Sequence, residues 1–218
     1  MADTPARPPA RVAHLPRDKH GRFVPWFVAW IDGVPDFRIV AAGKVTEAVR
    51  FSKCFVCGQD LGRFVTFAVG PMSTINRSAP EPPTHKDCAL YAAQSCPFLL
   101  RPGKGRRSGG LPAGLALETH GPGVTTPHNP GVTALWTTRS YEPQPDGKGG
   151  LLFRMGDPEE VLWLAEGRPA TRAEAGEALA NERDTLEELI RAGPTSAQPA
   201  DLAALASGYA AAERLLPA

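Results

Sequence analysis

Two pairs of metal-binding side chains lie close together in the middle of the sequence. Cys54 and Cys57 form a C-x2-C pair, and after 27 intervening residues His85 and Cys88 form an H-x2-C pair. Three thiolates and one imidazole complete the tetrahedral ligand set of structural zinc sites. The apolar residues 89–93 favour a helix, and side chains three apart share one helix face. We therefore predict that these four residues hold one structural zinc ion (Zn2+).

The fourth cysteine, Cys96, is eight positions beyond Cys88 and directly precedes Pro97. Eight residues of continuous helix span about 12 Å, too far for both thiols to bind one ion. We expect Cys96 to be a buried thiol outside the site. Two alternatives to zinc remain. A redox pair expects a thioredoxin-like βαβ pattern, which does not surround Cys54, and a disulfide framework needs an oxidising compartment.

The sequence argues against several enzyme classes. A catalytic zinc ion keeps one position open for water, whereas the predicted ligand set is full. The zinc deaminase signature is absent, as are the G-x-x-x-x-G-K-[ST] and G-x-S-x-G motifs. Nucleases of the HNH type carry a catalytic histidine between the ligand pairs, and residues 58–84 contain none. We expect no catalytic activity, with an HNH-like treble-clef nuclease as the alternative.

Composition points to a loop-rich protein inside the cell. The chain has 23 prolines and 22 glycines among 218 residues, so much of it must be loop or extended segment. No apolar run approaches the ~20 residues of a membrane helix, and the N-terminus has no hydrophobic signal region. We expect a cytoplasmic protein without membrane contact.

Charge divides the chain into a basic body and an acidic end. Residues 1–155 carry 19 basic and 11 acidic side chains, whereas residues 156–218 carry 5 basic and 12 acidic ones. The acidic end either covers a basic surface or meets a different partner, unless both are ordinary solvated surfaces. We expect a disordered tail at 1–20, a zinc-containing α+β domain at 21–155 and an acidic helical lobe at 156–218.

In the N-terminal half, hydrophobic runs and turn residues predict strands at 23–31 and 37–40 as a hairpin, a helix at 44–52 and a strand at 63–69. A cysteine knuckle, a strand, a loop and a helix that supplies two ligands follow one another, which is the order of a treble clef. Trp26 and Trp30 lie on the same side of the first strand. They form either a stacking platform or, as we expect, part of the core.

In the C-terminal half, a strand at 132–138 and the turn residues at 146–150 lead to a second hairpin arm at 151–154. Asp157, Pro158 and two glutamates predict the start of a short helix that ends at Gly167. Thr171-x-x-Glu174 matches a capping box, which predicts a helix to about residue 192, and a last helix follows at 201–216. The sequence thus predicts an α+β fold: small sheets and hairpins around a treble-clef-like zinc site, with a helical C-terminal lobe.

A basic, glycine-rich loop at 101–110 could contact phosphates. Its cations are Arg101, Lys104, Arg106 and Arg107. It contains no aromatic residue, so a solvated surface loop is the competing interpretation. His120 and His128 lie among turn-forming residues without neighbouring cysteines or carboxylates, and we interpret them as loop histidines.

Several phrases resemble an uncharacterised family of small actinobacterial and actinophage proteins with a treble-clef-like zinc site. The phrases are VPWFVAWIDGVPDFR, CFVCGQDLGRF, GPMSTINR, EPPTHKDCALYAAQSCPFL and GDPEEVLWLAEGRPATRAE. They touch most of residues 22–175, which implies one continuous unit. Members tend to have cysteine where Ser73 stands, which implies that this position is not an essential ligand. The resemblance implies no activity.

We therefore expect a non-catalytic, zinc-stabilised interaction module that binds a protein or a nucleic acid. The alternatives are a nucleic-acid-binding protein that uses the basic loop 101–107 and the HNH-like nuclease. The sequence does not indicate an oligomeric state.

Overall fold

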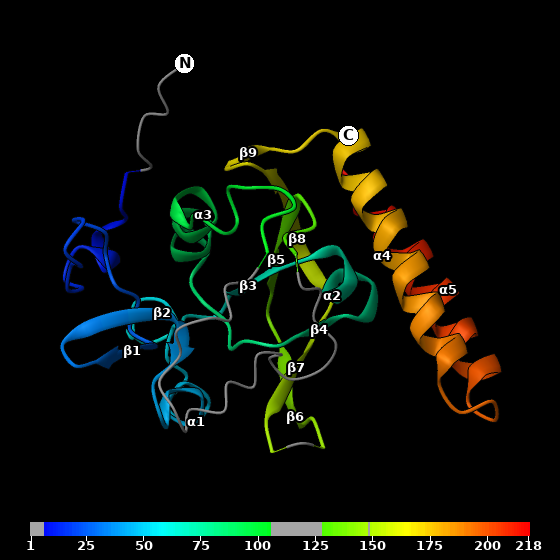
Figure 1. The fold of residues 1–218 in the computed structure, drawn as a ribbon, viewed down its shortest axis with the longest axis horizontal. Helices are drawn as coiled ribbons and strands as arrows, with labels where there is room; N and C mark the ends of the chain where they lie inside the picture. The colour runs from blue at the N-terminus through cyan, green and yellow to red at the C-terminus, as the bar shows by residue number, and fades with distance from the viewer. Residues whose placement is uncertain (1–6, 106–127, 148) are drawn as a thin grey trace.

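The computed structural model describes residues 7–105, 128–147 and 149–218, and this part of the chain has the predicted α+β fold (Figure 1). The strands are β1 (Val28–Ile31), β2 (Val34–Val40), β3 (Val65–Val69), β4 (Ser78–Ala79), β5 (Val132–Thr138), β6 (Tyr141–Pro145), β7 (Leu151–Met155), β8 (Pro158–Ala165) and β9 (Arg168–Pro169). The helices are the 3-10 helix η1 (Ala10–Val12), α1 (Lys44–Arg50), α2 (Pro71–Asn76), α3 (Lys86–Ser95), α4 (Arg172–Ala192) and α5 (Gln198–Glu213).

The core is built around an antiparallel sheet with the strand order β3-β5-β8-β9. Its central strand β5 is buried at every residue, because helices cover both faces of the sheet. Ala134 and Trp136 of β5 pack in the cluster that includes residues of α2, α4 and α5. Leu135 points the other way and packs against Ala89 and Ala93 of α3. Figure 1 shows α3 on one side of the sheet and the α4–α5 pair on the other.

The C-terminal helical lobe is confirmed and is anchored to the central sheet. Helix α4 begins at the predicted capping box, in which the Glu174 backbone N–H donates to Thr171 Oγ1 and the Thr171 N–H donates to the Glu174 carboxylate. The buried Trp163 of β8 donates its indole N–H to the carbonyl oxygen of Leu215 over 2.8 Å. This hydrogen bond ties the chain after α5 to the sheet.

Residues 158–165 form strand β8, so the predicted helix from Asp157 to Gly167 is wrong. Strand β8 pairs antiparallel with β5, and Trp163 lies opposite Ala134. Residues 161–165 are a short apolar run, and periodicity does not distinguish a strand from a short helix in such a run. The acidic, helical part of the chain therefore begins after β9. The expected domain boundary at residue 156 would separate β8 and β9 from β3 and β5 of the same sheet.

The two predicted hairpins are present, one of them with a different first arm. Strands β1 and β2 form a two-stranded antiparallel sheet around the turn Asp32–Gly33. Strand β7 pairs with β6 across the predicted turn, and on its other side with β4. We expected residues 132–138 to be the first arm, but this segment pairs with β3 and β8 instead.

The N-terminal segment 7–20 is ordered, contrary to the expected disordered tail, whose residues 1–6 lie outside the described residues. It forms η1 and a bridge between Arg17 and Phe23. Val12 is 1% exposed and Leu15 is 7% exposed. Both side chains belong to a buried cluster, which anchors a segment whose prolines and charges are typical of disorder.

Among the described residues, no helix is both long and apolar enough to span a membrane.

Candidate metal centre

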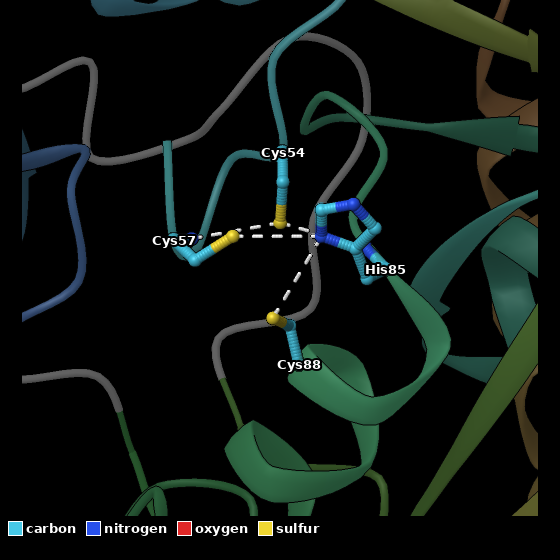
Figure 2. A group of neighbouring side chains, drawn as sticks. All are labelled: Cys54, Cys57, His85 and Cys88. Atoms are coloured by element: carbon cyan, nitrogen blue, oxygen red, sulfur yellow. Dashed lines mark hydrogen bonds between the residues drawn. The ribbon is translucent and has the colours of Figure 1, made fainter. Parts of the chain in front are cut away.

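Cys54, Cys57, His85 and Cys88 lie together in the folded chain, and their ligand atoms are all within 4.8 Å of one another (Figure 2). His85 Nδ1 is 3.5 Å from Cys57 Sγ and 4.0 Å from Cys88 Sγ. With Zn–S bonds of about 2.3 Å and a Zn–N bond of about 2.1 Å, nitrogen and sulfur ligands of a tetrahedral ion are about 3.6 Å apart. The four side chains could therefore hold a metal ion.

The centre is closed to solvent. Cys54 and Cys88 are 0% exposed, Cys57 is 1% exposed and His85 is 9% exposed. A metal ion held by all four would have a complete protein ligand set in a buried position. This is the arrangement of structural sites, because catalytic sites keep a position for water or substrate.

The first pair lies on a tight turn after α1. The Cys54 N–H donates to the Gln59 carbonyl over 2.7 Å, and the Gly58 N–H donates to the Cys54 carbonyl over 2.8 Å. Gly58 has a φ of 73°, a left-handed conformation that favours glycine. The turn also directs the Cys57 N–H at Cys54 Sγ, 3.5 Å away, so the backbone stabilises negative charge on that sulfur.

The second pair is positioned by the central sheet and by α3. Thr84 is bridged to Thr66 of β3 by two backbone hydrogen bonds of 2.8 Å. His85 follows directly as the N-cap of α3, and Cys88 lies in the first turn of that helix. A further hydrogen bond from the Phe55 N–H to the Pro83 carbonyl, 3.1 Å long, joins the two halves of the centre.

The imidazole of His85 is oriented by a backbone carbonyl. Its Nε2 lies 3.0 Å from the carbonyl oxygen of Asp60, which can only accept a hydrogen bond. Nε2 therefore carries the hydrogen, and the lone pair of Nδ1 faces the thiols of Cys57 and Cys88 (Figure 2). Metal-binding histidines characteristically donate their second ring N–H in this way, which fixes the tautomer and the ring plane.

The thiols affect one another's ionisation strongly. Hydrogen bonds from Cys57 and Cys88, and from the backbone N–H groups of Cys57 and His85, hold the pKa of Cys54 far below its usual value. The pKa values of Cys57 and Cys88 are raised, first of all by their hydrogen bonds to Cys54 and also by burial. Three buried thiols at this spacing cannot all ionise unless a cation balances their charge, so the donor set fits a divalent metal.

The centre is covered by the N-terminal segment and by the residues just before the β1–β2 hairpin. Val12 and Leu15 share a buried cluster with the three clustered cysteines, and Phe23 and Trp26 pack against it. The Trp26 N–H donates to the Val56 carbonyl over 2.8 Å, which attaches the start of the β1–β2 hairpin to the cysteine turn. An ion pair between Arg11 and Asp87 of α3 is added at the surface.

Among the other predicted residues, Cys96 lies outside the centre, as expected, at the C-cap of α3 and only half-buried. All four cysteines are free thiols. In the basic loop, Arg101 is exposed and Lys104 is half-buried. Arg106, Arg107 and His120 lie outside the described residues, and the loop's contact with nucleic acid stays a prediction. His128 forms a bridge with Gly105 and is not part of the metal centre.

The expectation that both tryptophans are core residues is wrong for Trp30, which is 45% exposed. Trp26 is half-buried against Gly58, and the Nζ atom of Lys44 lies 3.8 Å from its ring centroid. Two parts of the centre had no sequence signal. The Asp60 carbonyl is a backbone atom, and Val12 and Leu15 stand in a segment whose composition suggests disorder.

No family model, curated protein or solved structure matches this chain.

Proposed function

We propose that this protein is a non-catalytic interaction module whose fold is stabilised by one structural zinc ion. The observation that carries the proposal is the closed Cys3His centre, with all four donors buried and within 4.8 Å of one another. Among divalent metals, zinc is the usual ion of a tetrahedral site with sulfur and nitrogen donors. The turn with two cysteines followed by two donors at a helix N-terminus supports the treble-clef class.

The interaction role is supported by what the metal would hold in place. Segments 7–26, 53–61 and 83–95 meet at the centre. The first of them continues into the β1–β2 hairpin, on which the aromatic rings of Trp30 and Phe37 are exposed. The free thiols support a location in the reducing cytoplasm, where disulfides are rare.

Metal content by mass spectrometry tests the proposal, on the wild type and on three cysteine variants. We expect one zinc ion per chain, lost in Cys54→Ser and Cys88→Ser and kept in Cys96→Ser. Retention of zinc in Cys88→Ser, with loss in Cys96→Ser, would contradict the ligand set. Absence of metal from every sample would contradict the proposal itself.

A further inference from the structure

A hollow of about 220 Å3 opens between residues 17–22 and the turn that joins β1 and β2. Trp30 and Val34 from the hairpin form its apolar wall, and they are 45% and 58% exposed. Arg17, Lys19 and Arg22 line the opposite side. An exposed indole thus faces a basic segment across a concave surface.

The basic side of the hollow carries a surplus of positive charge. The residues that line the hollow include three cations, Arg17, Lys19 and Arg22, and one acidic residue, Asp18. Asp18 is paired with Arg22 at 2.6 Å, and Lys19 has no ion-pair partner in the part of the chain that the structure describes. The surface is complementary to an anionic ligand and leaves Lys19 available to bind it.

A second exposed aromatic ring adjoins the hollow. Phe37 of β2 is 39% exposed, and the guanidinium carbon of Arg22 lies 5.0 Å from its ring centroid. Arg22 therefore contacts this ring and lines the hollow as well. Alternating aromatic planes and cations are the combination with which proteins bind single strands, since bases stack on the rings and phosphates meet the cations.

The size of the hollow indicates how much of a ligand it holds. Pockets for whole drug-sized molecules are about 300–1,000 Å3, so this one is small for such a ligand. One base with its sugar and phosphate is a unit of suitable size. A polymer with repeated base and phosphate groups would continue onto Phe37.

We propose that this surface binds single-stranded nucleic acid, with a base stacked on Trp30 and phosphates bound by Lys19 and Arg17. The proposal rests on the zinc-stabilised module proposed above, because Val12 and Leu15 attach the basic segment to the metal centre. A duplex fits less well, since its bases are already stacked on one another. An acidic peptide would use the cations but would leave the exposed indole without a role.

The test is fluorescence anisotropy with a labelled oligothymidylate of about twelve nucleotides and zinc-loaded full-length protein. We expect Trp30→Ala to weaken binding by at least about fivefold, the low end of base–aromatic stacking. Lys19→Ala should reduce the slope of log Kd against log salt concentration by about 0.7, the value for one phosphate of a single strand.

Matched controls are available on the acidic lobe. Leu189 on α4 is 45% exposed, like Trp30, and Arg214 after α5 is exposed, like Lys19. Figure 1 shows this lobe on the opposite side of the molecule from the β1–β2 hairpin. Leu189→Ala and Arg214→Ala should leave both the affinity and the salt slope unchanged.

Three results would overturn the inference: no binding by the zinc-loaded wild type at low salt, unchanged affinity in Trp30→Ala, or equal competition by polyglutamate of matched charge. The last result would assign the surface to an acidic protein partner. Zinc measured on the same samples separates the two proposals. Protein that holds zinc but fails to bind the strand contradicts only this inference, whereas protein without zinc contradicts the proposed function.

Discussion

The indole ring of Trp26 lies directly against Gly58: a Cβ atom on Gly58 would be 2.6 Å from Trp26 Cδ1. Gly58 follows the C-x2-C pair and has a φ of 73°. Two independent features thus require glycine at this position: the left-handed backbone conformation and the space that the Trp26 ring occupies. The contact joins the start of the β1–β2 hairpin to the metal centre.

We predict that Gly58→Ala destabilises the protein by about 2 kcal/mol or more, from backbone strain and from overlap with the ring. Urea unfolding of the zinc-loaded protein measures this. Gly33→Ala is the matched control, because Gly33 has a φ of 76° and its added Cβ would meet no atom within 4 Å. Equal losses in the two variants would show that the Trp26 contact contributes nothing.

Removal of the metal should unfold the centre before the helical lobe. Structural zinc contributes an apparent ~10–16 kcal/mol in finger peptides, comparable with the roughly 5–15 kcal/mol net stability of a domain. Hydrogen exchange after chelation should therefore show lost protection at residues 53–60 and 83–90, with α4 retaining more. Unchanged protection at both segments would show that the centre folds without metal.

Two glycines within helices should respond to alanine in opposite directions. On Gly176 of α4 a Cβ would be 3.7 Å from Leu216 Cδ1, which is ordinary contact. On Gly208 of α5 it would be 2.5 Å from the backbone oxygen of Ile75 in α2. Thermal unfolding should show that Gly176→Ala stabilises by about 0.5–1 kcal/mol, as helix propensity predicts, and that Gly208→Ala destabilises by about 1–3 kcal/mol. Stabilisation in both would contradict the close packing of α5 on α2.

Glu182 of α4 is 7% exposed, and its Oε2 has no hydrogen-bond partner among the described residues. Burial raises the pKa of this carboxyl above its usual value, so its charge opposes folding at neutral pH. Glu182→Met should therefore stabilise the protein at pH 7 by about 1–3 kcal/mol.

The sign of the pH dependence provides a second check on Glu182. The Glu182 carboxyl binds a proton more tightly in the folded state than in the unfolded state. The free-energy cost of burying its charge is therefore present above the folded pKa and decreases as the pH falls through that pKa. The advantage of Glu182→Met over wild type should shrink from pH 8 to pH 5 in urea unfolding. Glu188→Met at an exposed position of the same helix should show neither effect.

The two ligand pairs could be predicted from the sequence because the residues of each pair are close together in the chain. A C-x2-C turn and two donors in the first turn of a helix need only short-range geometry, and Thr171 with Glu174 marked the start of α4 in the same way. The backbone group that orients His85 in the centre could not be predicted from the sequence. The Asp60 carbonyl that orients His85 is common to every residue type, and only the fold brings it to the ring.

Strand β8 shows how tertiary context overrides a local signal. Asp157 and Pro158 resemble a helix start, yet the backbone groups that follow pair with β5 across the whole strand. In the structure the Asp157 carboxylate instead accepts a hydrogen bond from Arg77, 2.8 Å away. For Trp30 the sequence contained no signal at all, because no pattern indicated which face of the two-stranded hairpin is exposed to solvent.

The anchoring of Val12 and Leu15 on the cysteine cluster has a consequence during synthesis. Their segment leaves the ribosome before Cys88, and the surface that buries it is complete only when Cys88 has emerged. At about 5–20 residues per second, the segment waits for several seconds. A nascent chain that stops before Cys88 therefore exposes both side chains, and any truncation intended to isolate the N-terminal half must extend through α3.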